Sequence, residues 1–277
     1  MQDEGKSMIP EELKKYQKYL LEMLLVFDTF CRENKLSYFL AGGSTLGAVR
    51  HQGFIPWDDD IDLAMMRSDF ERMEQLLEKQ GNRLSEYCYS PVAKQIIPDA
   101  PIGHLLYLPD GAYPQSAAPK LDIHPIDGVP EGKAGKFLQR FFVIVHYMSV
   151  YRLPTKNKGR AARGISKLLI KVTPDKLFDF YVRFSKKVIT AKKTEKSEKV
   201  CSLFGLAGYD REVMDKDILL PYHRIPFCGH MLPVPHQVQP YLEHLYGDYN
   251  TLPPEKDRYP KHMGYLAFVH AMDGERR

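Results

Sequence analysis

The sequence contains few cysteines, and no apolar run in it is long. Its four cysteines, Cys31, Cys88, Cys201 and Cys228, lie far apart and form no CxxC pair. That spacing argues against a disulfide framework and against a zinc ribbon, so it favours a reducing compartment. No apolar stretch is long enough to span a bilayer, and the polar N-terminus lacks the features of a secretory signal. We therefore expect a cytoplasmic protein.

Positive charge is in small excess, and this excess is concentrated in one segment. The formal net charge of the 277 residues is +4. Residues 131–200 contain 18 Lys and Arg against 5 Asp and Glu, a balance of +13, whereas the other residues contain 21 against 30, a balance of −9. A hydrophobic content of 44% indicates a folded globular protein. The asymmetry sets residues 131–200 apart from the rest of the chain.

A glycine-containing turn follows the first predicted strand. The apolar run 38–41 predicts a short strand, and Gly42, Gly43 and Ser44 follow it as a turn into a helix over about 45–51. Backbone N–H groups and a helix N-terminus would then face the same point, which favours the binding of a phosphate. We therefore predict that these three residues bind substrate.

Two aspartates alternate with apolar residues in the next predicted strand. If residues 60–66 form a strand, the carboxylates of Asp60 and Asp62 lie on one face, while Ile61 and Leu63 point into a core. Acidic clusters are most often solvated loops, but an acid pair in a buried strand is destabilising without a cation. Hard oxygen ligands suit Mg²⁺ or Mn²⁺. The sequence therefore predicts a metal site at these two aspartates, next to the phosphate site.

A later segment carries a third acid with the same alternation. Residues 120–124 place Asp122 and His124 on one face of a predicted strand. If this strand lies beside the strand of Asp60 and Asp62, Asp122 completes a set of three catalytic carboxylates. It would be a third metal ligand or the base that takes the proton of the acceptor hydroxyl, for which His124 is the other candidate. The alternative is an edge strand whose polar face lies in water.

Three further residues near the glycine turn are candidates for binding substrate. Arg50 offers a forked cation for the same anion as the turn. Trp57 is a candidate for stacking on a base or a quaternary ammonium, and Asp58 for assisting the metal or orienting Arg50. Asp59 would point to the opposite side if the strand begins that early, so we leave it out of the predicted metal site.

The rest of the chain predicts further helices and strands. Its pattern predicts helices over about 10–31, 69–79, 135–153, 160–172, 174–191 and 236–246, a β-rich region over 84–128 and a hairpin over 223–234. Ser68 and Glu71 form a capping-box pattern before the second of these helices. The succession of strands and helices predicts an α/β (α+β) fold with a mixed sheet flanked by helices.

The basic segment 131–200 allows two interpretations. It is either a buried helix beside a solvated basic face, or a surface that sits against anionic lipid headgroups or an anionic glycan. The second interpretation adds a peripheral contact with the inner face of the cell membrane. We divide the chain into a catalytic core over 1–130, this basic helical segment over 131–200, and a C-terminal segment over 201–277 that packs back on the core and completes the site.

The run GGSTLGAVRHQGFIPWDDDIDLAM closely resembles the signature of the LicD family, and KLDIHPIDG (120–128) and YLEHLYGDYNTLPP (241–254) resemble later blocks of that family. The family includes bacterial phosphocholine transferases and the animal fukutin-related proteins. The resemblance implies a nucleotidyltransferase-like fold and a phosphorylcholine-transferase type of activity. It further implies transfer of a phospho-alcohol from a CDP-linked donor, such as CDP-choline or a CDP-alditol, to a hydroxyl of a glycan of the cell surface, with CMP as the leaving group. The implied pathways are those of lipopolysaccharide, teichoic acid or capsule, with an acceptor that is in some cases lipid-linked.

Three other functions compete with this one. A nucleotidyltransferase that modifies a small molecule would use the same glycine turn and aspartates but an NTP donor. A nucleic-acid-binding module would use the basic segment, but no RRM, KH or zinc-finger pattern accompanies it, so we expect no nucleic-acid partner. A non-catalytic assembly protein would have no need of clustered acids.

Overall fold

The computed structural model describes residues 10–91, 102–108, 117–152, 164, 167–168, 170–205, 207–261 and 264–275. Its centre is a mixed sheet with the strand order β1-β2-β6-β5-β4-β3, to which β7 and β8 are added through β6, and a separate hairpin consists of β9 and β10. The strands are β1 (Phe39–Leu40), β2 (Ile61–Met66), β3 (Arg83–Leu84), β4 (Tyr87–Ser90), β5 (Gly103–Leu106), β6 (Lys120–Gly128), β7 (Lys199–Ser202), β8 (Val213–Asp215), β9 (His223–Phe227) and β10 (His230–Val234). The predicted mixed α/β architecture and the predicted hairpin are confirmed.

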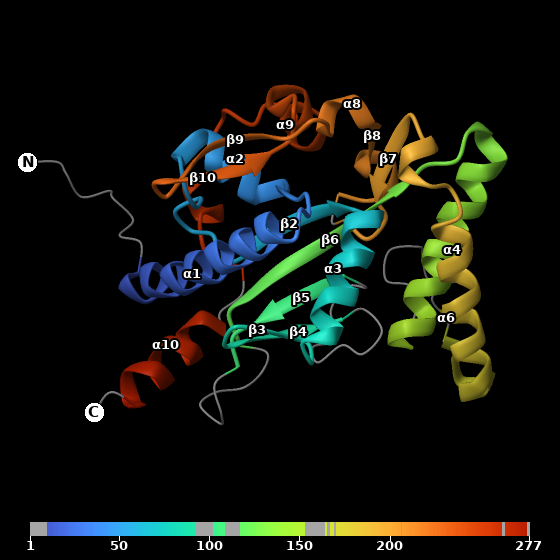
Figure 1. The fold of residues 1–277 in the computed structure, drawn as a ribbon, viewed down its shortest axis with the longest axis horizontal. Helices are drawn as coiled ribbons and strands as arrows, with labels where there is room; N and C mark the ends of the chain where they lie inside the picture. Colours follow the sequence, from blue (N-terminus) through green and yellow to red (C-terminus); the bar gives the residue numbers. More distant parts are fainter. Residues whose placement is uncertain are drawn as a thin grey trace, which may run out of the picture.

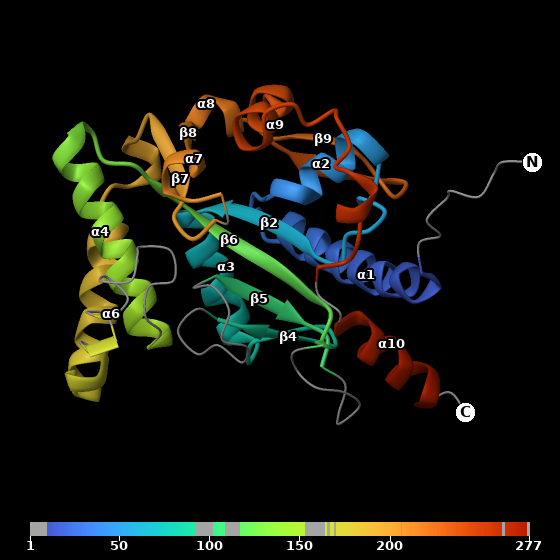
Figure 2. The same cartoon turned by 180° about the vertical axis from the view of Figure 1, so that it is seen from behind.

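Helices flank this sheet (Figure 1). They are α1 (Glu11–Glu33), α2 (Gly42–His51), α3 (Arg67–Lys79), α4 (Gly132–Tyr151), α6 (Asp175–Ile189), α7 (Tyr209–Glu212), α8 (Lys216–Leu219), α9 (Val238–Tyr246) and α10 (Gly264–Glu275), with short 3₁₀ turns η3 (Thr194–Lys196) and η4 (Glu255–Asp257). Helices α1 and α3 cover one face of the sheet, as the view from behind also shows (Figure 2). The predicted helix over 160–172 lies mostly outside the described residues.

The two faces of β2 and β6 meet different surroundings. These strands pair in parallel, with Asp62 opposite Asp122, so β6 is an internal strand and not an edge. Alternation sends Leu63 and Ile123 into the core that contains α1. It sends Ala64 to the opposite face, into a second core that contains α9. The polar side chains of β2 and β6 alternate with the residues of the first core, so they lie on the α9 side of the sheet.

Helix α3 does not begin as the sequence predicts. Ser68 and Glu71 form no capping box, because the helix starts at Arg67, with Met66 at the N-cap and no side-chain hydrogen bond there. The Arg67 guanidinium donates two hydrogen bonds, of 2.7 and 2.6 Å, to the buried carboxylate of Asp127 on β6. This bidentate pair ties the first residue of the helix to the sheet, so a tertiary contact and not a local cap fixes the start.

Helices α4 and α6 form an antiparallel pair at the end of the molecule away from both termini (Figures 1 and 2). The buried amide of Gln139 on α4 anchors this pair. Its Nε2 donates to the carbonyl oxygens of Gly128 (2.9 Å) and Ile189 (2.8 Å), and its Oε1 accepts from the hydroxyl of Tyr209 (2.8 Å). One side chain thus joins α4 to the end of β6, to α6 and to α7. In the described part of the chain, no helix has both the length and the apolar character needed to cross a membrane.

We expect Gln139→Leu to lower the free energy of unfolding by about 1–3 kcal/mol, because it leaves buried carbonyl groups without donors. Urea denaturation measures this change. Gln75→Leu, at an exposed position of α3, is the control and should change stability by less than about 0.5 kcal/mol. Equal effects of the two substitutions would show that Gln139 is not an anchor.

Candidate functional site

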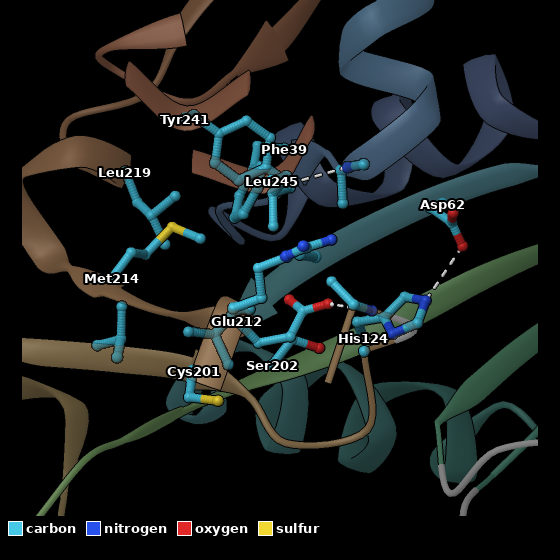
Figure 3. Close-up of a pocket in the computed structure, with 18 of the residues that line it drawn as sticks. Phe39, Asp62, His124, Cys201, Ser202, Glu212, Met214, Leu219, Tyr241 and Leu245 are labelled. Carbon is cyan, nitrogen blue, oxygen red and sulfur yellow. Dashed lines mark hydrogen bonds and ion pairs between the residues drawn. The ribbon is translucent and has the colours of Figure 1, made fainter. Parts of the chain in front are cut away.

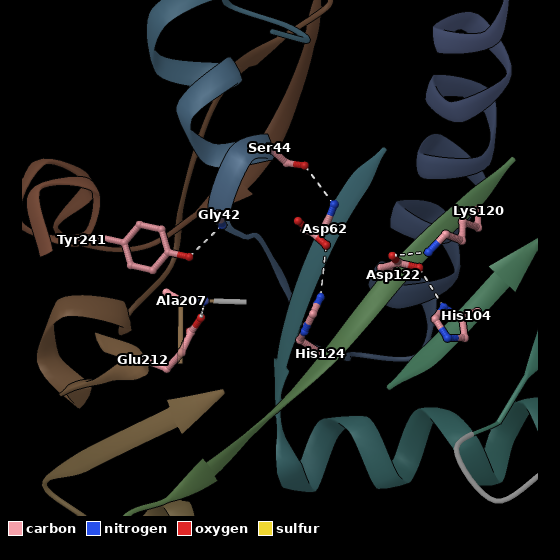
Figure 4. A network of polar contacts seen from close by, with 10 residues as sticks. All are labelled: Gly42, Ser44, Asp62, His104, Lys120, Asp122, His124, Ala207, Glu212 and Tyr241. Carbon is pink, nitrogen blue, oxygen red and sulfur yellow. Dashed lines mark hydrogen bonds and ion pairs between the residues drawn. The ribbon is translucent and has the colours of Figure 1, made fainter. Parts of the chain in front are cut away.

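The candidate site lies where α2 begins, beside β2 and β6 (Figure 4). The backbone N–H of Ala41 donates to the carbonyl oxygen of Asp62 at 2.9 Å, which brings the start of α2 against β2. The hydroxyl oxygen of Ser44 accepts the N–H of Asp62 at 3.0 Å. Gly42, Gly43 and Ser44 belong to the first turn of α2 and do not form a turn before it. The structure brings them against the aspartate strand, as the sequence predicts.

Three consecutive aspartates precede β2. Oxygen atoms of Asp58, Asp59 and Asp60 lie within 4.8 Å of one another. Burial, and next the charges of Asp62, Asp58, Asp122 and Asp59, raise the pKa of Asp60 to about 9. Burial and the charge of Asp62 raise the pKa of Asp58 to about 6. We call these five carboxyl groups, Asp58, Asp59, Asp60, Asp62 and Asp122, the acid cluster.

The acid cluster has the chemistry of a divalent cation site. Its oxygen atoms are hard ligands, and burial and the repulsion between carboxylates raise the pKa values of Asp58 and Asp60. A divalent cation would offset that repulsion. Asp59, which the sequence analysis leaves out, is buried within the cluster. Because β2 begins only at Ile61, the alternation of a strand does not apply to residues 58–60.

The acid cluster should make the stability of the metal-free protein depend on pH. Folding raises the pKa of Asp60 from an ordinary 3.8 to about 9, so between these values the folded state holds a proton that the unfolded chain releases. Raising the pH through this window therefore favours unfolding. We expect Asp60→Asn to flatten this decline and to raise Tm by about 2–4 °C at the alkaline end. Thermal melts in EDTA across this pH range measure the change in Tm.

Asp217→Asn, at an exposed position of α8, is the control for these melts and should keep the wild-type dependence on pH. The same slope in wild type and in Asp60→Asn would contradict the assignment of a protonated Asp60 to the metal-free protein.

Asp122 is held by two basic side chains. The ring Nδ1 of His104, on β5, lies 2.7 Å from Oδ1 of Asp122, and Lys120 donates from Nζ to Oδ2 at 2.7 Å. Burial by itself would raise the pKa of Asp122, but the hydrogen bond from His104 and the charge of Lys120 hold it below its usual range. Asp122 therefore stays a carboxylate. The sequence gives no signal for His104, whereas Lys120 shares the face of Asp122 by alternation.

His124 contacts the acid cluster from the next position on the same face. Its Nε2 lies 3.1 Å from Oδ1 of Asp62. Burial lowers the pKa of His124, but the hydrogen bond and charge of Asp62 outweigh burial and raise it. The contact with Asp62 therefore favours the protonated form of His124 in the metal-free protein.

A cavity of about 300 Å³ opens beside Asp62 and His124 (Figure 3). Polar groups of Glu212, Tyr246 and Lys261 line it as well. Apolar side chains supply much of the rest, among them Phe39, Met214, Leu219, Tyr241 and Leu245. The cavity combines an apolar wall with charged side chains at its rim, as small-molecule sites do.

Glu212 is a site residue that the sequence analysis does not find. It accepts the N–H of Ala207 at 3.2 Å, and burial raises its pKa. Helix α7 is a single turn in a turn-rich region, so no periodicity singles Glu212 out. It brings a second acid to the cavity, opposite the acid cluster.

The start of α2 is in close contact with this cavity. The N–H of Gly42 donates to the hydroxyl of Tyr241 at 2.8 Å. A Cβ on Gly42 would lie 3.3 Å from the hydroxyl of Tyr246, and a Cβ on Gly43 would lie 3.3 Å from a carboxylate oxygen of Asp58. Glycine therefore allows the backbone to approach the acid cluster and the aromatic rim.

Arg50 and Trp57 each contact a residue from the later part of the chain. Arg50 donates from Nη1 to the carbonyl oxygen of Tyr249 at 3.0 Å. The guanidinium of Arg258 lies over the Trp57 ring, 5.7 Å from its centroid. Burial and next the charge of Arg258 lower the pKa of Arg50. Among the described residues neither arginine has a carboxylate partner, so the two guanidinium groups suit an anion.

Comparisons with known proteins find several similar chains. Residues 35–94 match the family model described as LicD/FKTN/FKRP, nucleotidyltransferase domain. The lipopolysaccharide cholinephosphotransferase LicD of Haemophilus influenzae is 28% identical over 266 residues, which cover 91% of this chain and 96% of that protein. The ribitol 5-phosphate transferase FKRP of Homo sapiens is 54% identical over 39 residues, which cover 14% of this chain and 8% of that protein. The uncharacterized protein RP689 of Rickettsia prowazekii is 41% identical over 73 residues, 24% of this chain and 27% of that protein.

Proposed function

Since the chain is a transferase of the LicD family, we propose that it moves phosphocholine or a related phospho-alcohol from a CDP-linked donor to a hydroxyl of a cell-surface glycan and releases CMP. Similarity along most of the chain to a cholinephosphotransferase supports phosphocholine, and local similarity to a ribitol 5-phosphate transferase supports the wider class. The observation that carries the proposal is the acid cluster at the start of α2, beside a cavity of about 300 Å³.

Asp60, Asp62 and Asp122 are the metal ligands in this proposal, and Asp58 assists them. The burial and repulsion that raise the pKa of Asp60 fit a site for Mg²⁺ or Mn²⁺. When bound, the cation neutralises charge on the phosphate oxygens and on the leaving phosphate. Helix α2 begins beside these carboxylates, so Gly43 and the Ser44 hydroxyl are positioned to bind a phosphate oxygen.

Arg50 and Arg258 bind a phosphate of the donor as forked cations in this proposal. The ring of Trp57 packs on the guanidinium of Arg258 and supports it. The structure places Arg258 on the face of Trp57 that would otherwise be a candidate for stacking. Gly42 leaves the space between Tyr246 and Asp62 open, which is where the transferred group enters the cavity.

The chemical step is an in-line displacement at phosphorus. The oxygen of the acceptor hydroxyl bonds to the phosphorus of the transferred group, the bond to the phosphate of CMP breaks, and CMP leaves with that oxygen. The hydroxyl proton passes to Asp122 or to His124, which lie next to each other on one face of β6. The reaction takes place in the cytoplasm in this proposal, which the four free cysteines support.

The test is release of CMP from CDP-choline, CDP-ribitol and CDP-glycerol with Mg²⁺ or Mn²⁺, in the presence and absence of a glycan acceptor. We expect CMP from one of these donors, and its loss in EDTA. The nucleotidyltransferase alternative uses the same acid cluster, so each NTP is assayed in parallel. Pyrophosphate from an NTP, with no CMP from any CDP-linked donor, would overturn the proposal.

A further inference from the structure

Helices α4 and α6 expose a group of aromatic rings, which we call the aromatic face. It consists of Phe137 and Phe141 on α4 and Phe180 and Phe184 on α6, exposed by 71%, 50%, 50% and 44%. The half-buried Phe142 links the two helices, since its ring centroid lies 5.3 Å from that of Phe141 and 5.4 Å from that of Phe184. Phe180 and Phe184 stack at 5.7 Å. The large exposed apolar area marks a contact surface.

Basic side chains border the aromatic face on α6. On α6, Lys176, Arg183 and Lys187 lie three or four residues from Phe180 or Phe184, so they share their side of the helix. All three are exposed, and in the described part of the chain none of them makes an ion pair. Helix α4 contains no acid. Aromatic rings flanked by lysine and arginine on an amphipathic helix are typical of a helix that lies in a membrane interface.

We propose that the aromatic face docks on the surface of a bilayer that contains anionic lipids. Charge complementarity favours this occupant, because the cations beside the rings attract anionic headgroups while the rings enter the acyl boundary. A second copy of this chain would instead bring like charges together on the same face. None of the described helices is suited to crossing the membrane, so the contact is peripheral.

The position of α4 connects the aromatic face with the candidate site. A second cavity lies between Arg140, Val143 and Ile144 of α4 and the segment around α7. Its wall shares Gly205, Ala207 and Arg211 with the wall of the 300 Å³ cavity beside Asp62. The two cavities are therefore neighbours, and a glycan acceptor held by a lipid in the bilayer would approach the acid cluster from the side of α4. This last step rests on the proposed function, whereas docking itself does not.

Co-sedimentation with vesicles tests the docking. The full chain is mixed with vesicles of phosphatidylcholine alone, or of phosphatidylcholine with phosphatidylglycerol. We expect binding to the anionic vesicles only, weakened by salt. Reversal of charge at Lys176, Arg183 and Lys187 to Glu should weaken binding by about a hundredfold or more. The double substitution of Phe180 and Phe184 by Ser should weaken it by about tenfold or more.

A matched control has the same number of charge reversals away from α4 and α6. Lys18→Glu, Lys79→Glu and Arg83→Glu, at exposed positions of α1, α3 and β3, should leave vesicle binding within about threefold of wild type if docking is local. The variants should keep the wild-type circular dichroism spectrum and rate of CMP release without vesicles. Because vesicle binding needs no turnover, a failure of the proposed function leaves this test intact.

Four results would overturn the proposal. The first is the absence of wild-type binding to anionic vesicles at low salt. The second is equal loss of binding in the α6 and control charge variants, and the third is unchanged binding after the Phe→Ser substitutions, since either would make the attraction non-specific. The fourth is a wild-type dimer, seen by light scattering, that the Phe→Ser substitutions dissociate, because the aromatic face would then be a contact between copies.

Discussion

Asp62→Asn should lower the rate of CMP release by about a thousandfold or more, and Asp60→Asn should have an effect of the same size. Asparagine keeps the shape of each side chain but removes the charge that a cation needs. Asp62 lies opposite Asp122 in the parallel pair of strands, and the charges of both neighbours act on Asp60. Each substitution therefore removes one negative charge from the acid cluster.

Rates at saturating donor, with Mg²⁺ or Mn²⁺, measure this loss. Circular dichroism and thermal melts show whether each variant is folded. Asp217→Asn, on the exposed surface of α8, is the control and should keep the wild-type rate. If either cluster variant were folded and retained more than about a tenth of the wild-type rate, the metal assignment would be wrong.

The location of this cluster follows from short-range patterns in the sequence. Alternation places Asp62 on the face opposite Leu63, and it places Asp122 on the face opposite Ile123. Parallel pairing of β2 and β6 then sets the two acids side by side. The pattern therefore predicts the face of each acid, and the sheet order supplies the contact between them.

The residues that sequence reasoning misses come from distant, isolated positions. His104 reaches Asp122 from β5, Glu212 reaches the cavity from a single helical turn, and Arg258 reaches Trp57 after the last strand. None of them sits in a motif, so only the topology brings them to the site. The start of α3 is missed for the same reason, because the Arg67–Asp127 contact links two separate elements.

The sequence pattern likewise cannot predict that the aromatic face is exposed. Helix α4 has apolar residues around much of its circumference, which fits a buried helix as well as an interfacial one. Gln139 is buried whereas Phe137 and Phe141 are exposed, and both depend on where α6 packs. The predicted buried helix is therefore exposed along one side, and a contact with lipid stays a proposal.

Asp122→Asn should lower the rate of CMP release by about a hundredfold to a thousandfold, with little loss of folding. The wild-type carboxylate accepts from His104 and Lys120, each at 2.7 Å, and these partners keep it charged. Asparagine still accepts one of the two hydrogen bonds but has no charge to offer. Glu86→Gln, at an exposed position before β4, is the control and should keep the wild-type rate. A folded Asp122→Asn with a rate within about threefold of wild type would remove Asp122 from the site.

The dependence of this rate on metal separates the two roles of Asp122. If Asp122 is a ligand, the Mg²⁺ concentration for half-maximal activity should rise by about tenfold to a hundredfold in Asp122→Asn, and excess metal should restore part of the rate. If it is the base, the metal requirement should stay the same and no metal concentration should restore the rate. His124→Gln distinguishes the remaining case, because a base at His124 predicts that this variant loses the pH dependence of kcat. Since His104 and Lys120 hold the pKa of Asp122 below its usual range, Asp122 is a weak proton acceptor, and we expect the metal requirement to change.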